Sequence, residues 1–86
     1  MRTAAKRDNN EPEIVAALEA VGCVVHRLSQ AGIPDLLVGR NGVTYLLEVK
    51  ERKGALTDEQ EIFFENWNGC AYIVRCVEDA LEVVGL

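Results

Sequence analysis

The sequence predicts an α/β domain in which a mixed sheet is flanked by helices. Three observations carry this prediction. Helical and strand patterns follow one another in the order αβββαβα, Asn41-Gly42 stands between the second and third strands, and the fourth strand is reached through a helix. Asn-Gly is the strongest short hairpin signal, so the second and third strands are expected to be antiparallel. The helical connection to the fourth strand makes the sheet mixed and puts helices on its faces.

The chain divides into a short arm and one domain. Residues 1–9 are polar without periodicity and are interpreted as a flexible, weakly basic arm, whereas residues 10–86 are interpreted as a single domain. The first helix is expected to begin at Asn10 or Glu11, either of which can cap it, and to end at Gly22 as a glycine after the last turn would.

The remaining elements are short. Strand patterns occupy residues 23–27, 35–39, 43–50 and 71–75. Thr57 and Gln60 match a capping box and start a second helix that reaches about residue 67, with apolar residues 62, 63 and 67 on one stripe. Apolar spacing indicates a last helix over residues 77–84.

Composition bounds the class of protein. The 86 residues are 49% hydrophobic and 27% charged, which is typical of a globular domain. No apolar run approaches the roughly 20 residues that cross a bilayer, and the polar start does not match a secretory signal. We therefore expect a cytoplasmic protein of a phage or bacterial host, or one associated with the nucleoid, with no membrane and no small-molecule cofactor as partner.

Charge is unevenly distributed along the chain. The net charge is −5, which by itself disfavours a nucleic-acid partner. Residues 1–54, however, carry eight Lys or Arg side chains against seven Asp or Glu, whereas residues 55–86 carry one against seven. A polyanion is therefore expected to meet the first part, where bound divalent cations would also offset the carboxylates.

The cysteines do not suggest a zinc site. Cys23, Cys70 and Cys76 are odd in number, form no CxxC pair and stand among apolar neighbours. We expect three reduced, buried thiols.

Three residues predict a site for metal-assisted chemistry. Glu48 and Lys50 point to the same face near the end of their strand, and Asp35 begins the strand on the other side of the hairpin. Cross-strand neighbours lie about 4.5–5.5 Å apart at Cβ, so one divalent cation can bridge the two carboxylates. Separately, Glu48 and Lys50 can be a solvated pair at a strand end and Asp35 a turn residue after Pro34; together they favour a metal site.

Lys50 has a suitable role beside such a metal. Its ammonium is a compact charge that can hold the attacking water or stabilise the charge that develops on a phosphate. A bound metal ion would supply the hydroxide nucleophile and polarise the phosphate.

The pattern resembles a known nuclease signature. Pro34-Asp35, followed thirteen positions later by Glu48 and then Val49-Lys50, is similar to the PD-(D/E)XK motif. Over residues 10–78 the chain resembles the VRR-NUC group of virus-type replication-repair nuclease domains and, more distantly, Holliday-junction resolvases. The segments that carry the resemblance are Asn10-Glu11-Pro12-Glu13-Ile14-Val15, Gly32-Ile33-Pro34-Asp35-Leu36-Leu37, Leu46-Leu47-Glu48-Val49-Lys50 and Leu56-Thr57-Asp58-Glu59-Gln60.

This resemblance implies a fold and an activity. The fold is a restriction-endonuclease-like αβββαβ core, here with a short C-terminal helix. The activity is Mg²⁺- or Mn²⁺-dependent hydrolysis of phosphodiester bonds in branched DNA, as in a Holliday-junction resolvase. Because a resolvase makes paired symmetric cuts, a two-fold homodimer is expected. The alternatives are a 5′ flap or duplex nuclease and a non-catalytic DNA- or protein-binding module, which would be expected to lack one of Asp35, Glu48 or Lys50.

The resemblance also implies further site residues. One is a glutamate of the first helix, for which Glu11 and Glu13 compete; at 100° per residue Glu11 shares the inward apolar face and Glu13 points to water, so we favour Glu11, which can reach the metal through water. The backbone carbonyl of Val49 is a further metal ligand. Gln60 is expected to bind the attacking water or a phosphate, unless it serves only the capping box.

Basic and polar residues complete the predicted site. His26 is expected to be half-buried or to face DNA rather than to act as a base, because the metal already supplies hydroxide. Each candidate phosphate contact is, taken singly, more often a solvated group. The candidates are Arg2, Lys6, Arg7, Arg27, Ser29, Arg40, Arg52 and Lys53.

Overall fold

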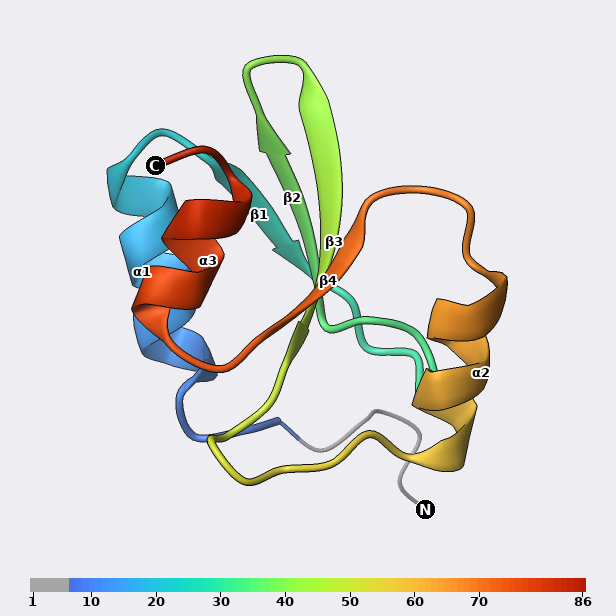
Figure 1. The fold of residues 1–86 in the computed structure, drawn as a ribbon. Helices are drawn as coiled ribbons and strands as arrows, with labels where there is room; N and C mark the ends of the chain where they lie inside the picture. The colour runs from blue at the N-terminus through green and yellow to red at the C-terminus, as the bar shows by residue number, and fades with distance from the viewer. Residues whose placement is uncertain (1–6) are drawn as a thin grey trace.

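The structure is a computed structural model that describes residues 7–86. Figure 1 shows a twisted sheet with two helices on one side and a third helix standing apart on the other. The elements are α1 (Glu11–Ala20), β1 (Val24–Arg27), β2 (Leu36–Arg40), β3 (Val43–Val49), α2 (Asp58–Asn66), β4 (Ala71–Val74) and α3 (Val77–Val83).

The sheet is mixed, as the sequence predicts. Its strand order is β1-β2-β3-β4, with antiparallel pairs β1–β2 and β2–β3 and a parallel pair β3–β4. The β2–β3 turn has positive φ at both central residues, 51° at Asn41 and 81° at Gly42. Asn and Gly tolerate this backbone better than other residues, which explains why the hairpin closes here.

The first helix begins and ends where the sequence indicates, although its cap differs from expectation. Gly22, with φ of 95°, follows the last turn in the left-handed region. Asn10 occupies the N-cap position, but its side chain makes no capping hydrogen bond. Its Nδ2 instead donates to the backbone carbonyls of Lys50, at 3.2 Å, and Arg75, at 3.1 Å. Asn10 thus ties the start of α1 to the ends of β3 and β4.

One face of the sheet is covered by α1 and α3 (Figure 1). The register sets Leu36 opposite Leu47, and both are fully buried beneath the helices. Alternation along each strand sends every second residue into this core. The core consists of Ile14, Val15, Leu18, Cys23, Leu36, Val38, Leu47, Val49, Val74, Ala80 and Val84.

The other face of the sheet is open. Leu37 and Ile73, on β2 and β4, are 36% and 38% exposed, and Val24 on β1 is 63% exposed. The α2 helix stands away from this face rather than lying on it (Figure 1). Its apolar stripe is largely solvated, with Ile62 56% and Trp67 47% exposed. The described chain therefore leaves apolar surface on both α2 and the sheet.

The cysteines differ from the prediction. Cys23 is buried, whereas Cys70 is exposed and Cys76 is half-buried. Cys70 lies in the exposed segment between α2 and β4, so its apolar neighbours in sequence do not cover it. The sulfur of Cys76 accepts a hydrogen bond from the backbone N–H of Asp79 at 3.4 Å and caps α3.

Part of the predicted arm belongs to the ordered domain. Residues 1–6 lie outside the described part of the chain. Asp8 Oδ2 accepts from the Glu51 N–H at 2.9 Å, and the Asn9 N–H donates to Glu51 Oε2 at 3.1 Å. Together with the contacts of Arg7 described below, these hydrogen bonds tie residues 7–9 to the rest of the domain. No helix among residues 7–86 is long and apolar enough to span a membrane.

We expect Leu36→Ala to destabilise the protein strongly. Leu36 is fully buried in the core that the sheet forms with α1 and α3, and comparable truncations cost about 2–5 kcal/mol. The control is Leu86→Ala, the same truncation at a residue that is 57% exposed. Urea unfolding followed by circular dichroism measures both. Similar losses in the two variants would contradict the assignment of this core.

Candidate active site

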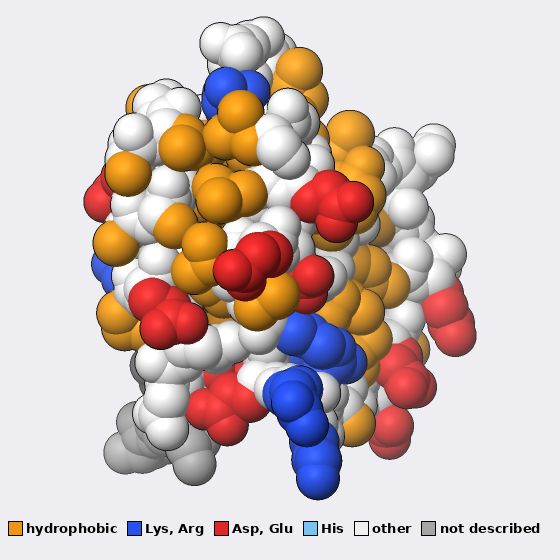
Figure 2. Space-filling model, turned by 60° about the vertical axis from the view of Figure 1, so that its left-hand side comes forward, with side chains coloured by type: hydrophobic (Ala, Val, Ile, Leu, Met, Phe, Trp, Pro, Cys, Tyr) orange, Lys and Arg blue, Asp and Glu red, His pale blue; other side chains and the backbone are white. Residues whose placement is uncertain are grey.

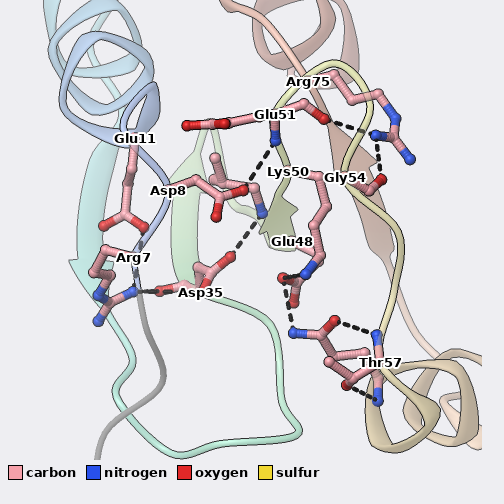
Figure 3. A network of polar contacts seen from close by, with 12 residues as sticks. Arg7, Asp8, Glu11, Asp35, Glu48, Lys50, Glu51, Gly54, Thr57 and Arg75 are labelled. Carbon is pink, nitrogen blue, oxygen red and sulfur yellow. Dashed lines mark hydrogen bonds and ion pairs between the residues drawn. The ribbon is translucent and has the colours of Figure 1, made fainter.

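Asp35 and Glu48 meet at one end of the β2–β3 hairpin, as predicted. Continuing the register one step from the pair Leu36–Leu47 puts Asp35 opposite Glu48. Both are buried, with 6% and 1% of their surface exposed. Asp35 Oδ2 accepts from the backbone N–H of Val49 at 2.8 Å, which fixes its carboxylate beside the end of β3 (Figure 3).

Glu48 is buried beside Gln60 and Lys50. Its Oε2 accepts from Gln60 Nε2 at 3.1 Å and lies 3.8 Å from Lys50 Nζ. Its Oε1 is buried and has no hydrogen-bond partner among the described residues. Burial and then the nearby Asp35 carboxylate raise the pKa of Glu48 to about 8, against the opposing effect of the Lys50 ammonium.

Gln60 forms the predicted capping box and also contacts Glu48. Its side-chain Oε1 accepts from the Thr57 N–H at 2.9 Å, and its own N–H donates to Thr57 Oγ1 at 3.2 Å. These two bonds make the capping box at the start of α2. The remaining amide donor, Nε2, reaches Glu48. The cap therefore orients Gln60 toward the site.

Glu11, not Glu13, faces the site. Glu11 is 2% exposed and Glu13 is exposed, in agreement with the helical periodicity. Glu11 Oε2 accepts from Arg27 Nε at 2.9 Å, and its Oε1 lies 3.3 Å from Arg7 Nη1. Both oxygens of the acid are thus paired with guanidinium groups.

Arg75 is a supporting residue that the sequence did not single out. Its Nη1 donates to the carbonyls of Glu51 at 2.9 Å and Gly54 at 2.7 Å, with Arg52 at 3.3 Å (Figure 3). It therefore holds the loop that follows Lys50. The side-chain contacts of Asp8, Asn10 and Arg75 span 21 to 65 residues in sequence, so no local pattern could have indicated them.

The candidate phosphate contacts do not all lie at the site. Arg7 and Arg27 contact the acids. Three others occupy exposed loops next to it: Ser29 after β1, and Arg52 and Lys53 after β3.

Arg40 lies at the far end of the β2–β3 hairpin, where its Nη1 donates to the Val84 carbonyl at 3.0 Å. Its observed contact is structural. Arg2 and Lys6 lie outside the described residues. Figure 2 shows Lys and Arg side chains grouped low on one face, close to acidic side chains.

The donor set suits a hard divalent cation. Within residues 7–86, no three His, Cys, Asp or Glu side chains are gathered into a ready metal cage. Mg²⁺, however, uses one or two carboxylates and takes its other ligands from water and phosphate. Asp35 and Glu48 supply two neighbouring carboxylates, and Glu48 Oε1 is buried without a partner. These residues fit such an ion.

Comparison with known proteins supports the fold. A solved structure titled "VRR_NUC domain" is similar to this chain with a TM-score of 0.71 and 24% sequence identity, over 90% of this chain and 96% of that one. No family model and no curated protein matches the sequence. The chain therefore has the α/β fold of that domain, as the sequence resemblance predicts.

The raised pKa of Glu48 makes stability depend on pH. A carboxyl whose pKa is higher in the folded state than its ordinary 4.5 stabilises the fold while protonated, so this contribution is complete below pH 4.5 and lost as pH rises toward about 8. Without metal, we expect the free energy of unfolding to fall over this window, by at most about 1.4 kcal/mol per pH unit.

The matched variant is Glu48→Gln, which cannot ionise and should be less sensitive to pH between 5 and 8. Urea titrations in EDTA at several pH values measure the difference. Parallel pH profiles for the two proteins would show that Glu48 is not perturbed.

Proposed function

We propose that this protein is a metal-dependent DNA endonuclease that hydrolyses phosphodiester bonds in branched DNA. One observation carries the proposal. Two buried carboxylates, Asp35 and Glu48, lie side by side at the end of β3, and Lys50 is 3.8 Å from the second of them. Burying two neighbouring acids is costly unless a cation or a proton compensates them. A site of this kind is suited to holding a divalent ion.

The side chains divide the work of hydrolysis. Asp35 and Glu48 would hold Mg²⁺ or Mn²⁺, with the Val49 carbonyl as a further ligand and Glu11 acting through water. Such an ion would activate a water molecule and polarise the phosphate when bound. Lys50, 13% exposed and therefore little hydrated, stabilises the negative charge that develops on the phosphate.

Gln60 acts as a positioning residue. Its amide holds Glu48 Oε2 at 3.1 Å while the capping box fixes the amide itself. A carboxylate anchored through one oxygen presents the other in a fixed direction, and in Glu48 that second oxygen has no partner among the described residues. The start of α2 therefore contributes to the site by fixing the orientation of the Glu48 carboxylate.

DNA is expected to approach over the loops that surround the acids. Arg27 and Ser29 are exposed on one side of the site, and Arg52 and Lys53 on the other. Arg75 keeps the second loop in place. The acidic charge concentrates in residues 55–86, so repulsion of the DNA from that part would favour an approach over the first part.

A homodimer is the second element of the proposal. Leu37 and Ile73 on the open sheet face, and Ile62 and Trp67 on α2, are each exposed by more than a third. Large apolar surfaces rarely stay exposed on soluble monomers, and a domain of this size gains stability by association. A second copy would cover this surface and give the two-fold symmetry that paired cuts require.

The choice of a four-way junction rests on the resemblance to resolvases. A 5′ flap or duplex nuclease would use the same acids on another substrate, and a non-catalytic module would bind DNA without cleaving it. The presence of Asp35, Glu48 and Lys50 together, with Glu11 linked to Asp35 through Arg7, favours catalysis.

Cleavage of labelled DNA tests the activity. With Mg²⁺ or Mn²⁺, we expect the wild type to nick a four-way junction in preference to linear duplex, a splayed arm and a 5′ flap. Lys50→Ala should lower the rate by about 10²–10³-fold, because it removes a charge aimed at the transition state.

A neighbouring pair of acids supplies the matched control. Glu11→Gln should impair cleavage, while Glu13→Gln, at an exposed position on the same helix, should stay within about twofold of wild type. Equal cleavage by wild type and Lys50→Ala would exclude this site. Preference for the flap would redirect the proposal to that substrate.

Sedimentation equilibrium tests the dimer. We expect the wild type to have twice the chain mass at micromolar concentration and Leu37→Asp to be monomeric, because the substitution puts a charge on the open face. Val43→Asp is the control, since Val43 is similarly exposed at 42% but lies at the hairpin turn. Circular dichroism verifies folding. A monomeric wild type would rule out the dimer.

A further inference from the structure

Arg7 bridges two of the acids and joins the end of β1 to the start of β2. Its Nη1 lies 3.3 Å from Glu11 Oε1 and 3.6 Å from Asp35 Oδ1. The same nitrogen donates to the Asp35 carbonyl at 3.4 Å, and Nη2 donates to the Leu28 carbonyl at 2.7 Å. Figure 3 shows the guanidinium between the carboxylates of Glu11 and Asp35. The sequence alone indicates only a DNA contact for Arg7.

The Arg7 guanidinium offsets the repulsion between two buried carboxylates. Glu11 and Asp35 are 2% and 6% exposed, and two buried carboxylates repel unless positive charge lies between them. Glu11 also has Arg27, but among residues 7–86 no other Lys or Arg lies within ion-pair distance of Asp35. Arg7 therefore provides the positive charge that Asp35 contacts.

Arg7 occupies a place where a metal ligand atom has to be free. Asp35 Oδ2 already accepts from the Val49 N–H, so Oδ1 is the more available oxygen for a cation, and Oδ1 is the atom that faces Arg7. A guanidinium and a divalent ion on one carboxylate oxygen would repel each other. At 31% exposure, the Arg7 side chain is open enough to solvent to move aside.

We propose that Arg7 is an internal counter-cation of the metal-free site, which a divalent ion displaces from Asp35. This inference rests on the proposed metal site. It predicts that Arg7 weakens metal binding, since its interaction with Asp35 is lost when the ion enters. The bond to the Leu28 carbonyl keeps the guanidinium close, so the displaced side chain stays at the rim of the site.

Calorimetric titration with Mn²⁺ alone tests the inference without any cleavage readout. We expect Arg7→Gln to bind Mn²⁺ at least about fivefold more tightly than wild type, the lower end of ordinary coupling between two binding events. Lys53→Gln is the control: it removes the same charge from an exposed loop residue with no acidic partner among the described contacts, and should leave the Kd within about twofold.

The outcomes separate the two proposals. No binding of Mn²⁺ to wild type overturns the metal site and this inference together. Binding to wild type with an equal or weaker affinity in Arg7→Gln overturns the counter-cation alone and leaves Arg7 a structural tie. An equal gain in Lys53→Gln reduces the effect to net charge and likewise overturns it.

A measurement on the wild type covers the case in which Arg7→Gln does not fold. Nitrogen-15 spectra of the Arg7 guanidinium should show protected side-chain signals in EDTA, because three acceptors hold it. Saturating Mg²⁺ should shift these signals and speed their exchange with water. Signals that stay unchanged at saturation would overturn the inference.

Discussion

The hydrogen bond from the Val49 N–H to Asp35 Oδ2, buried and 2.8 Å long, is the constraint on which the site depends. It lies where β3 stops pairing with β2 and continues beside β4. Antiparallel pairing alone would set Asp35 opposite Glu48 but leave its side chain free to turn. The bond fixes Oδ2 of Asp35 at the end of β3 and leaves Oδ1 facing Arg7. The register of the two strands thereby determines the position of the Asp35 carboxylate in the site.

The acids are held in place by groups that serve the fold at the same time. Gln60 caps α2 and contacts Glu48, Asn10 joins α1 to the ends of β3 and β4, and Arg75 closes the loop after Lys50. The Gln60 side chain bonds both the backbone and Glu48, whereas the Asn10 and Arg75 side chains each bond backbone carbonyls of distant segments. Each of the three side chains therefore has few alternative conformations. Rigid support of this kind is what lets a small domain keep charged groups buried and correctly aimed.

The sequence predicted those features that depend on nearby residues. Asn41-Gly42 predicted the position of the hairpin turn, and Thr57 with Gln60 predicted the start of the second helix. Helical periodicity predicted that Glu11 is buried and that Glu13 is exposed. The sequence did not predict contacts between distant segments, because no residue spacing indicates that Arg7 contacts Asp35 or that Arg75 contacts Gly54. The prediction that Cys70 is buried was wrong for the same reason, because apolar neighbours in sequence do not show which connecting segments remain uncovered.

The open face and the site are linked by the alternation of β3. Leu47 and Val49 point into the core under α1 and α3, so Glu48 between them points to the other side, where Leu37 and Ile73 also lie. Glu11 comes from α1 on the covered side and is linked to Asp35 through Arg7 at the end of the sheet. A second copy bound to the open face would therefore adjoin Glu48 without burying Glu11 or Arg7, and the two sites of such a dimer would remain open to one DNA molecule.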